Sequence, residues 1–281
     1  MAVRIVTDST ADLSADVVER LGVTVVAQNV HFGTDTYKDN VTITPDTFFS
    51  MLATSKELPK TSQASPGDFK EVYDSVGEGA DGIVSIHVAA KLSGTYNSAV
   101  QAKDLTTAAC PIEVIDTTQA SMGEGLVVIA AAEAANGGAS MEEVVAVASG
   151  AAERSCCMAL LETLEYLQKG GRIGKAQAML GSILQIKPMI IVRDGEVHEL
   201  GKARTFAKAL VKLRETAHDM GPADALAVIH STTPDAAQAF ADSLSEMLPA
   251  GSVPYIARFG PALGVHVGPG AIGVALLQSQ A

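Results

Sequence analysis

Three segments of the chain are rich in hydroxyl side chains and glycine, which can hold a small anion without supplying a full positive charge. They are residues 7–10, residues 58–66 and residues 93–98. In the last of these, Ser93 and Gly94 come between a predicted strand and a predicted helix. Helix N-termini at the carboxyl ends of strands offer unpaired amides and a positive dipole end. The segment therefore predicts a small-anion cradle, while simple N-capping of the helix by Ser93 explains the same residues equally well.

Two further segments carry side chains that can meet an anion. His266 lies between valines in the glycine-rich residues 259–270. A lone histidine in such a setting is more often a core residue, but the glycines indicate close backbone approach and an imidazole can donate to an anion. Residues 169–175, which include Arg172, are the densest basic stretch. The simpler explanation is a basic helix C-terminus, and the functional alternative is a loop that steers a phosphate or a partner.

Several common kinds of site are excluded by spacing. The glycine patterns at residues 77–82 and 268–273 come before predicted strands, whereas a dinucleotide fingerprint follows a strand and opens a helix. No P-loop, His-Glu-x-x-His motif or Gly-x-Ser-x-Gly elbow occurs. The three cysteines, Cys110, Cys156 and Cys157, suit neither a disulfide framework nor a zinc site. We expect reduced thiols and neither a cofactor nor a metal ion.

Composition limits the class of protein further. The chain has 281 residues, 47% of them apolar and 19% charged, which is ample for a packed core. Its 20 basic against 32 acidic residues give a formal charge of −12, which disfavours binding to nucleic acid or to an anionic membrane surface. The apolar run at residues 126–132 is too short to span a bilayer. The first residues lack a signal-peptide pattern, so we expect a cytoplasmic protein.

The elements that position these segments alternate in the first half of the chain. Short runs rich in Val and Ile predict strands, and longer amphipathic stretches predict helices. This order is typical of a largely parallel sheet covered on both faces. The predicted strands are 3–7, 23–32, 83–88 and 112–116, and the predicted helices are 14–21, 46–54, 67–76, 94–105, 122–135 and 141–153.

The second half predicts a mixed sheet. Asp194 and Gly195 join two predicted strands and supply the positive φ of a tight turn, which indicates a hairpin. We therefore predict a two-domain α/β fold, with an N-terminal domain at residues 1–150 and a C-terminal domain at residues 151–281. The predicted strands are 156–161, 189–192, 196–200, 225–230, 253–258 and 272–277, and the predicted helices are 163–168, 177–183, 206–218 and 234–247.

Taken together and in this order, six segments resemble the DegV family, whose characterised members include the fatty-acid-binding subunit of bacterial fatty acid kinase. Each segment alone is weak, but the set in register is specific and spans nearly the whole chain. The resemblance implies a DegV-like fold that buries one long-chain fatty acid between or within its domains. The segments are residues 7–13, 59–63, 92–98, 164–173, 186–188 and 268–270.

The resemblance also implies roles for particular residues. The carboxylate of the fatty acid would be bound by Thr61, Ser62, Ser93 with the adjoining Gly94, and His266. Arg172 would act when a separate fatty acid kinase phosphorylates the bound acid to acyl phosphate for phospholipid synthesis, and Arg204 would be another basic residue near the head group. The chain would then be a ligand-binding subunit and not itself an enzyme, with only transient membrane contact.

Two other functions remain open at this point. The chain can instead be an acyl- or phosphoryl-transfer enzyme in which Ser93 is the nucleophile and His266 its base. It can also be a sugar binder similar to dihydroxyacetone kinase, which would take a small polar ligand. A covalent adduct at Ser93 would indicate the enzyme, and a narrow apolar cavity beside the hydroxyl groups would indicate the fatty-acid carrier.

Overall fold

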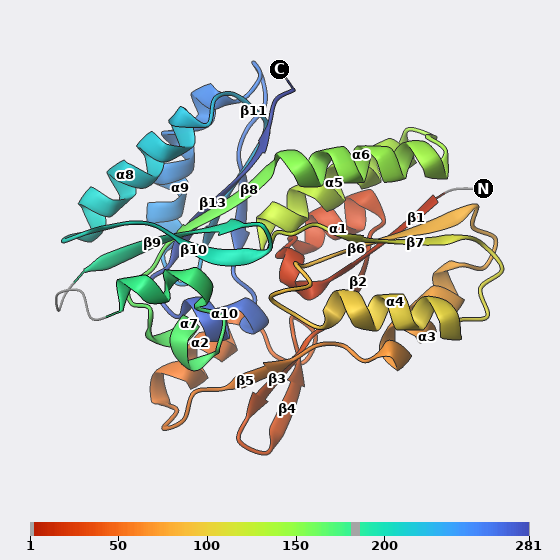
Figure 1. The fold of residues 1–281 in the computed structure, drawn as a ribbon, viewed down its shortest axis with the longest axis horizontal. Coiled ribbons are helices and arrows are strands. Elements are labelled where there is room, and N and C mark those ends of the chain that lie inside the picture. The colour runs from red at the N-terminus through yellow and green to blue at the C-terminus, as the bar shows by residue number, and fades with distance from the viewer. Residues whose placement is uncertain (1–2, 181–185, 281) are drawn as a thin grey trace.

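The computed structural model describes residues 3–180 and 186–280 and builds them around two large sheets and one small sheet (Figure 1). The first large sheet is entirely parallel, in the order β2-β1-β6-β7. This arrangement confirms the predicted parallel sheet of the N-terminal half. Its strands are β1 (Val3–Asp8), β2 (Thr24–Val26), β6 (Gly82–His87) and β7 (Ile112–Asp116).

Helices cover both faces of the parallel sheet, as Figure 1 shows. Successive side chains of a strand point to opposite faces. Ile5 accordingly packs in the core beneath α5 and α6, whereas its neighbour Val6 packs with Phe69 of α3. Two apolar layers therefore hold the carboxyl ends of β1 and β6 side by side. The helices of this half are α1 (Ala15–Leu21), α3 (Pro66–Val76), α4 (Thr95–Leu105), α5 (Met122–Asn136) and α6 (Met141–Arg154).

The second large sheet is mixed, in the order β10-β9-β8-β13-β11-β12, with only the β11–β12 pair parallel. Asp194 and Gly195 have φ of 53° and 74°, which confirms the predicted hairpin of β9 and β10. Helices α8 (Phe206–Asp219) and α9 (Pro234–Asp242) cover one face. The strands are β8 (Ser155–Leu160), β9 (Lys187–Arg193), β10 (Glu196–Ala203), β11 (Ala223–His230), β12 (Tyr255–Arg258) and β13 (Ile272–Gln278).

Helix α5 joins the two large sheets, because it packs against β1 and β6 of one and against β8, β11 and β13 of the other. Its side chains from Leu126 to Ile129 are buried on every side, as expected for a helix enclosed between sheets. A domain boundary at residue 150 stays a prediction. No helix of the described residues is long and apolar enough to cross a membrane.

A small antiparallel sheet, in the order β4-β3-β5, corrects one prediction. Residues 23–32 do not form a single strand, because β2 ends at Val26 and β3 (Asn29–Phe32) belongs to the small sheet. Gln28 lies buried at the break, where its backbone N–H donates to Ser9 Oγ at 3.0 Å. The polar segment after residue 58 contributes β5 (Lys60–Ser62), and β4 is Asp35–Lys38.

Three other elements differ from the prediction. The predicted helix at 234–247 ends at Asp242, and a short 3₁₀ helix, η3 (Ser245–Met247), follows it. The helix ends there because the Ser243 and Ser245 hydroxyls donate hydrogen bonds to backbone carbonyl oxygens at its end. Residues Gly174–Met179 form a 3₁₀ helix (η2), and the rest of the predicted 177–183 helix falls partly outside the described residues. Helix α10 (Pro261–Val267) was not predicted. The remaining helices are α2 (Pro45–Thr54), α7 (Glu165–Lys169) and the 3₁₀ turn η1 (Ser9–Ala11).

Candidate binding site

A narrow cavity lies between the two large sheets and is lined by residues from both halves of the chain. Its volume is about 110 Å³, well above the roughly 10–15 Å³ that a single buried water needs. Most of its wall is apolar, and this part of the wall comes largely from β8, β9 and β10 and from the loop after β6. The apolar residues include Val88, Leu92, Ala159, Leu167, Ile190, Val192, Val197, Phe259 and Leu263.

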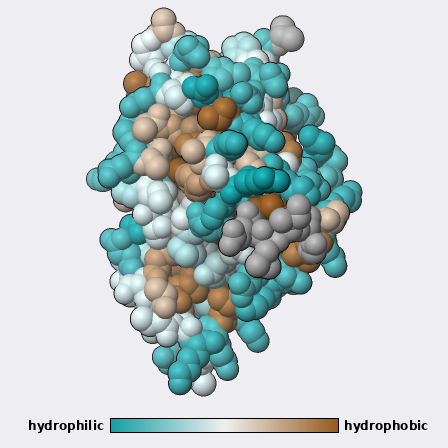
Figure 2. Space-filling model, turned by 90° about the vertical axis from the view of Figure 1, so that its left-hand side faces the viewer, coloured by the Kyte–Doolittle hydropathy of each residue, from teal (hydrophilic) through white to brown (hydrophobic). Residues whose placement is uncertain are grey.

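The apolar wall of the cavity is internal. Ala159, Ile190 and Val197 are buried in the face of the mixed sheet that turns toward α5. Figure 2 shows the outside of this half of the molecule, where hydrophobic residues form separate areas divided by hydrophilic ones. A ligand that uses the apolar wall must therefore enter the cavity.

Polar side chains gather at one part of the cavity wall. Ser93 follows β6 and precedes α4, Thr61 lies in β5, and His266 lies in the last turn of α10. Thr61 Oγ1 and His266 Nε2 are 3.2 Å apart. The structure thus brings together three predicted residues that are up to 205 positions apart along the chain.

His266 is a neutral imidazole near pH 7. Burial, together with the positive charge of Arg172, lowers its pKa to about 4. Nδ1 is buried without a hydrogen-bond partner among the described residues. Because a buried N–H without an acceptor is rarely tolerated, we assign the ring proton to Nε2, which then donates to Thr61 Oγ1. The proton of the Thr61 hydroxyl is left available to the cavity.

Arg172 is the positively charged side chain among the cavity-lining residues. Its Nε donates to the carbonyl of Leu92 at 3.1 Å, and its Nη1 donates to the carbonyl of Gly170 at 2.9 Å. The half-buried guanidinium therefore links the loop before Ser93 to the loop after α7. Arg172 thus lines the same cavity as Thr61, Ser93 and His266, and its role near a head group stays a prediction.

The other predicted residues are placed differently. Thr61 and Ser62 are adjacent in a strand and point to opposite faces, and Ser62 Oγ meets Asn29 Nδ2 at 3.2 Å and His31 Nε2 at 3.0 Å. Ser62 still lines the cavity. Gly94, by contrast, is not among the cavity-lining residues, and a β-carbon on it would come within 2.9 Å of Gln63 Nε2. Arg204 is exposed between β10 and α8 and does not line the cavity.

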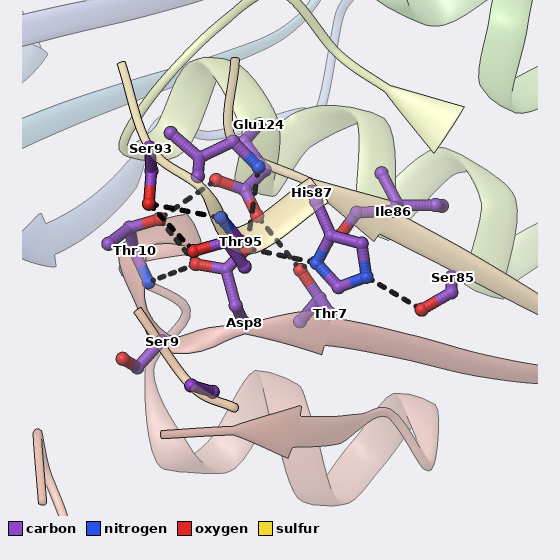
Figure 3. Close-up of polar contacts among 12 residues, drawn as sticks. Thr7, Asp8, Ser9, Thr10, Ser85, Ile86, His87, Ser93, Thr95 and Glu124 are labelled. Atoms are coloured by element: carbon purple, nitrogen blue, oxygen red, sulfur yellow. Dashed lines mark hydrogen bonds and ion pairs between the residues drawn. The ribbon is translucent and has the colours of Figure 1, made fainter. Parts of the chain in front are cut away.

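A buried polar network lies next to the cavity, at the carboxyl ends of β1 and β6 (Figure 3). Asp8 accepts from Thr10 N at 3.0 Å and from His87 Nδ1 at 3.0 Å, and it also contacts the Thr10 hydroxyl at 2.5 Å. Burial by itself raises the pKa of Asp8, but the hydrogen bond from His87 and those from Thr10 and Gln28 outweigh it and leave the pKa lowered. Asp8 is therefore a fully buried, ionised carboxylate.

Asp8, His87 and Glu124 have potential metal-ligating atoms within 4.8 Å of one another. All three already hydrogen-bond to protein groups: His87 Nε2 lies 2.6 Å from Ser85 Oγ, and Glu124 accepts from Thr7 Oγ1 at 3.1 Å. Burial and the nearby charge of Asp8 raise the pKa of Glu124 well above its usual range, so Glu124 keeps its proton. Internal hydrogen bonds account for this cluster.

Gln28 is a residue of the site that the sequence reasoning missed. Its Nε2 donates to Asp8 Oδ1 at 3.0 Å and to Thr95 Oγ1 at 2.8 Å, and its Oε1 accepts from Ala64 N at 3.0 Å. It also lines the cavity. The one available signal was a polar residue inside a predicted strand of Val, Ala and Phe.

Two buried carboxyl groups hold the start of α10, the helix that carries His266. Asp12 Oδ1 accepts from Gly260 N at 2.8 Å, and Asp39 Oδ1 accepts from Ala262 N at 3.3 Å. Burial raises the pKa of Asp39 to about 7 and raises that of Asp12 well above its usual range. The position of α10 thus depends on groups of which at least one titrates near neutral pH.

Comparison with known proteins covers almost the entire chain. Residues 2–279 match the model of a family described as "Uncharacterised protein, DegV family". A DegV domain-containing protein of Streptomyces coelicolor is 39% identical over 276 residues, which is 97% of each chain. A DegV domain-containing protein of Halalkalibacterium halodurans is 34% identical over 278 residues, again 97% of each chain.

Solved structures show the same fold. A Thermus thermophilus DegV family protein, described for its fatty acid binding, superimposes with a TM-score of 0.89 at 34% identity over 99% of this chain and 100% of its own. A Bacillus subtilis protein described as a fatty acid binding protein gives 0.87 at 28% identity, with the same coverage. A stearic acid-binding protein of Eubacterium ventriosum gives 0.84 at 28% identity over 98% of each chain.

Proposed function

Because the chain belongs to the DegV family, we propose that it binds one long-chain fatty acid in the cavity between its two large sheets. The carboxylate would lie at the wall formed by Thr61, Ser93 and His266, and the tail would lie along the apolar wall. The observation that carries this proposal is the cavity itself, which joins a narrow apolar interior to uncharged hydrogen-bond donors. The fatty acids of the Thermus and Eubacterium proteins support it.

The energetics favour an alkyl ligand. A tail of about 14 methylenes contributes on the order of 11 kcal/mol when it is buried, at about 0.8 kcal/mol per methylene. Desolvation of the carboxylate opposes binding by several kcal/mol. Two or three hydrogen bonds to the charged group, at about 1.5–3 kcal/mol each, largely offset that penalty. Tail burial then dominates the affinity, and the donors set the orientation.

We infer further that the protein presents its bound acid to a separate fatty acid kinase, which converts it to acyl phosphate for phospholipid synthesis. Arg172 supports this step, because its guanidinium lies beside the proposed carboxylate position and can balance the charge of an incoming phosphate. Arg204, which is exposed and away from the cavity, would contact the kinase surface instead of the ligand. A cytoplasmic location with transient membrane contact belongs to the same proposal.

The alternative of an acyl- or phosphoryl-transfer enzyme finds less support in the geometry. A serine nucleophile needs its base within hydrogen-bond reach. Ser93 Oγ is bonded to Thr95 Oγ1 at 2.8 Å, whereas His266 Nε2 is bonded to Thr61. The two candidate catalytic groups thus have different partners.

Mass spectrometry of an organic extract of the purified protein tests the proposed ligand. The expected result is a long-chain fatty acid in near-equal amount to the protein, which is removed by delipidation and restored by added palmitate. The kinase is tested separately, by incubating the palmitate-loaded protein with ATP and a fatty acid kinase and measuring acyl phosphate. A small polar molecule in the extract, together with no binding of palmitate by the delipidated protein, would overturn the proposal.

A further inference from the structure

We propose that Gln28 and Thr95 fix the direction of the Ser93 hydroxyl, so that Ser93 donates its proton into the cavity and selects a carboxylate over an alcohol. This inference rests on the proposed function and adds to it two positioning residues and a basis for head-group specificity. The argument follows a chain of hydrogen bonds that begins at Asp8 and ends at Ser93.

The first step fixes the amide of Gln28. Asp8 is ionised and can only accept hydrogen bonds, so the Gln28 atom 3.0 Å from Asp8 Oδ1 must be the NH₂ group. The backbone N–H of Ala64 can only donate, so the atom 3.0 Å from it must be the amide oxygen. Two partners of opposite kind therefore determine one orientation of the Gln28 side chain.

The second step fixes Thr95. The NH₂ group of Gln28 donates to Thr95 Oγ1 at 2.8 Å, so Thr95 uses a lone pair there. Its hydroxyl is completely buried, and within the described ranges the other partner of Oγ1 is Ser93 Oγ at 2.8 Å. If Ser93 donated to Thr95, the Thr95 proton would have no acceptor, and an unsatisfied buried donor is strongly unfavourable. Thr95 therefore donates to Ser93.

The third step follows for Ser93. Its Oγ accepts from the Thr95 hydroxyl and, at 3.3 Å, from the Thr95 backbone N–H, so both lone pairs are engaged. Its own proton is then directed to the space that remains, which is the cavity. A carboxylate, which only accepts, satisfies this proton completely. A fatty alcohol can accept from Ser93, but its own proton also needs an acceptor. Thr61 offers a second donor at this wall, which the proton of the alcohol cannot use.

The test compares two ligands of equal tail length, palmitate and 1-hexadecanol, on the delipidated protein. Thr95→Val keeps the shape of the side chain and removes the hydroxyl, so Ser93 loses its fixed direction. We expect wild type to prefer palmitate and Thr95→Val to lower the palmitate-to-hexadecanol affinity ratio about tenfold. Thr95→Ser, which keeps the hydroxyl, should restore the ratio. A hexadecanol affinity in Thr95→Val and Thr95→Ser that is no lower than in wild type controls for folding of the cavity.

A second variant approaches the same hydrogen-bond chain from its other end. Gln28→Glu replaces the NH₂ group with an oxygen, which can accept a hydrogen bond from the Thr95 hydroxyl. Thr95 would then donate to residue 28, and Ser93 would donate to Thr95 instead of into the cavity. The affinity ratio should again fall about tenfold. The bound carboxyl of [1-¹³C]palmitate, followed by NMR as a function of pH, should titrate about one pKa unit higher in either variant than in wild type, because the Ser93 proton is no longer held toward its ionised form. A purely structural defect would not move this pKa.

The outcomes separate the inference from the function on which it rests. If wild-type protein binds neither palmitate nor any fatty acid, the proposed function fails. If wild type binds and prefers palmitate, while folded Thr95→Val or Gln28→Glu keeps the wild-type ratio and carboxyl pKa, the inference is wrong. A variant that does not fold leaves the decision to the other one, because the two substitutions interrupt different bonds of the chain.

Discussion

Gly170→Ala tests the packing of His266 against the loop after α7. Gly170 has φ of −76°, so alanine is compatible with its backbone conformation. A β-carbon there would nevertheless collide with His266 Nδ1 and come within 2.9 Å both of its Cε1 and of the Tyr166 carbonyl oxygen. The imidazole must therefore move away, and its hydrogen bond to Thr61 is lost.

The change in the free energy of unfolding follows from three contributions, of which the first two destabilise the protein and the third stabilises it. Overpacking a well-packed site destabilises by about 1–3 kcal/mol, and loss of the His266–Thr61 hydrogen bond adds about 0.5–1.5 kcal/mol. Replacing glycine by alanine at a compatible backbone position returns about 0.4–1 kcal/mol. These contributions sum to a fall in the free energy of unfolding of about 0.5–4 kcal/mol. Palmitate affinity should fall with it, because the imidazole lines the cavity.

The assay is a double-mutant cycle with His266→Ala, followed by urea unfolding of the four delipidated proteins. His266→Ala removes the ring that the new methyl group would meet, so Gly170→Ala should be much less destabilising in that background. Gly150→Ala serves as the matched control. Gly150 lies inside α6 with nothing within 4 Å of its β-carbon position, so this exchange should stabilise by about 0.5–1 kcal/mol.

An equal loss of stability from Gly170→Ala in the wild-type and His266→Ala backgrounds would refute the reasoning. It would show that the methyl group is opposed by the backbone of α7 and not by the imidazole. Wild-type palmitate affinity in Gly170→Ala would likewise separate the position of His266 from ligand binding.

Three further predictions concern single side chains. Ser93→Ala should weaken palmitate binding about 10- to 150-fold, the equivalent of one hydrogen bond to a charged group, and unchanged affinity in a calorimetric titration would contradict this. Arg172→Gln should bind palmitate like wild type but yield less acyl phosphate with the kinase, whereas loss of palmitate would make Arg172 part of the binding wall. Asp39 has a folded-state pKa of about 7 against an ordinary value of 3.8, so between these values the folded protein carries a proton on Asp39 that the unfolded chain has lost. The free energy of unfolding therefore falls as the pH rises from about 4 to 7. Asp39→Asn should flatten that decline, and an unchanged pH profile of unfolding would show that Asp39 does not titrate there.

Most elements of the fold follow from local sequence. Short Val- and Ile-rich runs and amphipathic stretches predict them directly: the helix predicted at 14–21, for example, is α1, and Gly22 ends it at φ of 66°. The break between β2 and β3 was not predicted in this way, since valines lie on both sides of Gln28 and Asn29 and favour one continuous strand. Gln28 ends the strand because of partners such as Asp8 and Thr95, which are distant in sequence.

In the candidate site, too, some features follow from the sequence and others depend on contacts between distant segments. Residue types and order identified Thr61, Ser93, His266 and Arg172, and the structure brings all four to one cavity. Sequence could not show that Ser62 turns to the opposite face of β5, because that depends on the strand itself, which pairs with β3. Helix α10 escaped prediction because it is short and flanked by glycines, and it is held by Asp12 and Asp39 from the other end of the chain.

The cavity wall meets its proposed head group with hydroxyls and a neutral imidazole, and this choice has a physical consequence. A buried arginine or lysine in direct contact would form an ion pair with the carboxylate that is expensive to break once desolvated. Thr61 and Ser93 instead contribute hydrogen bonds that can be exchanged singly, and Arg172 is occupied with the carbonyls of Leu92 and Gly170. The buried negative charge of Asp8 further opposes tight retention of an anion nearby. In the proposed complex, a tail bound by its whole length and a head bound by neutral donors would let a partner enzyme reach the carboxylate while the protein still holds the acid.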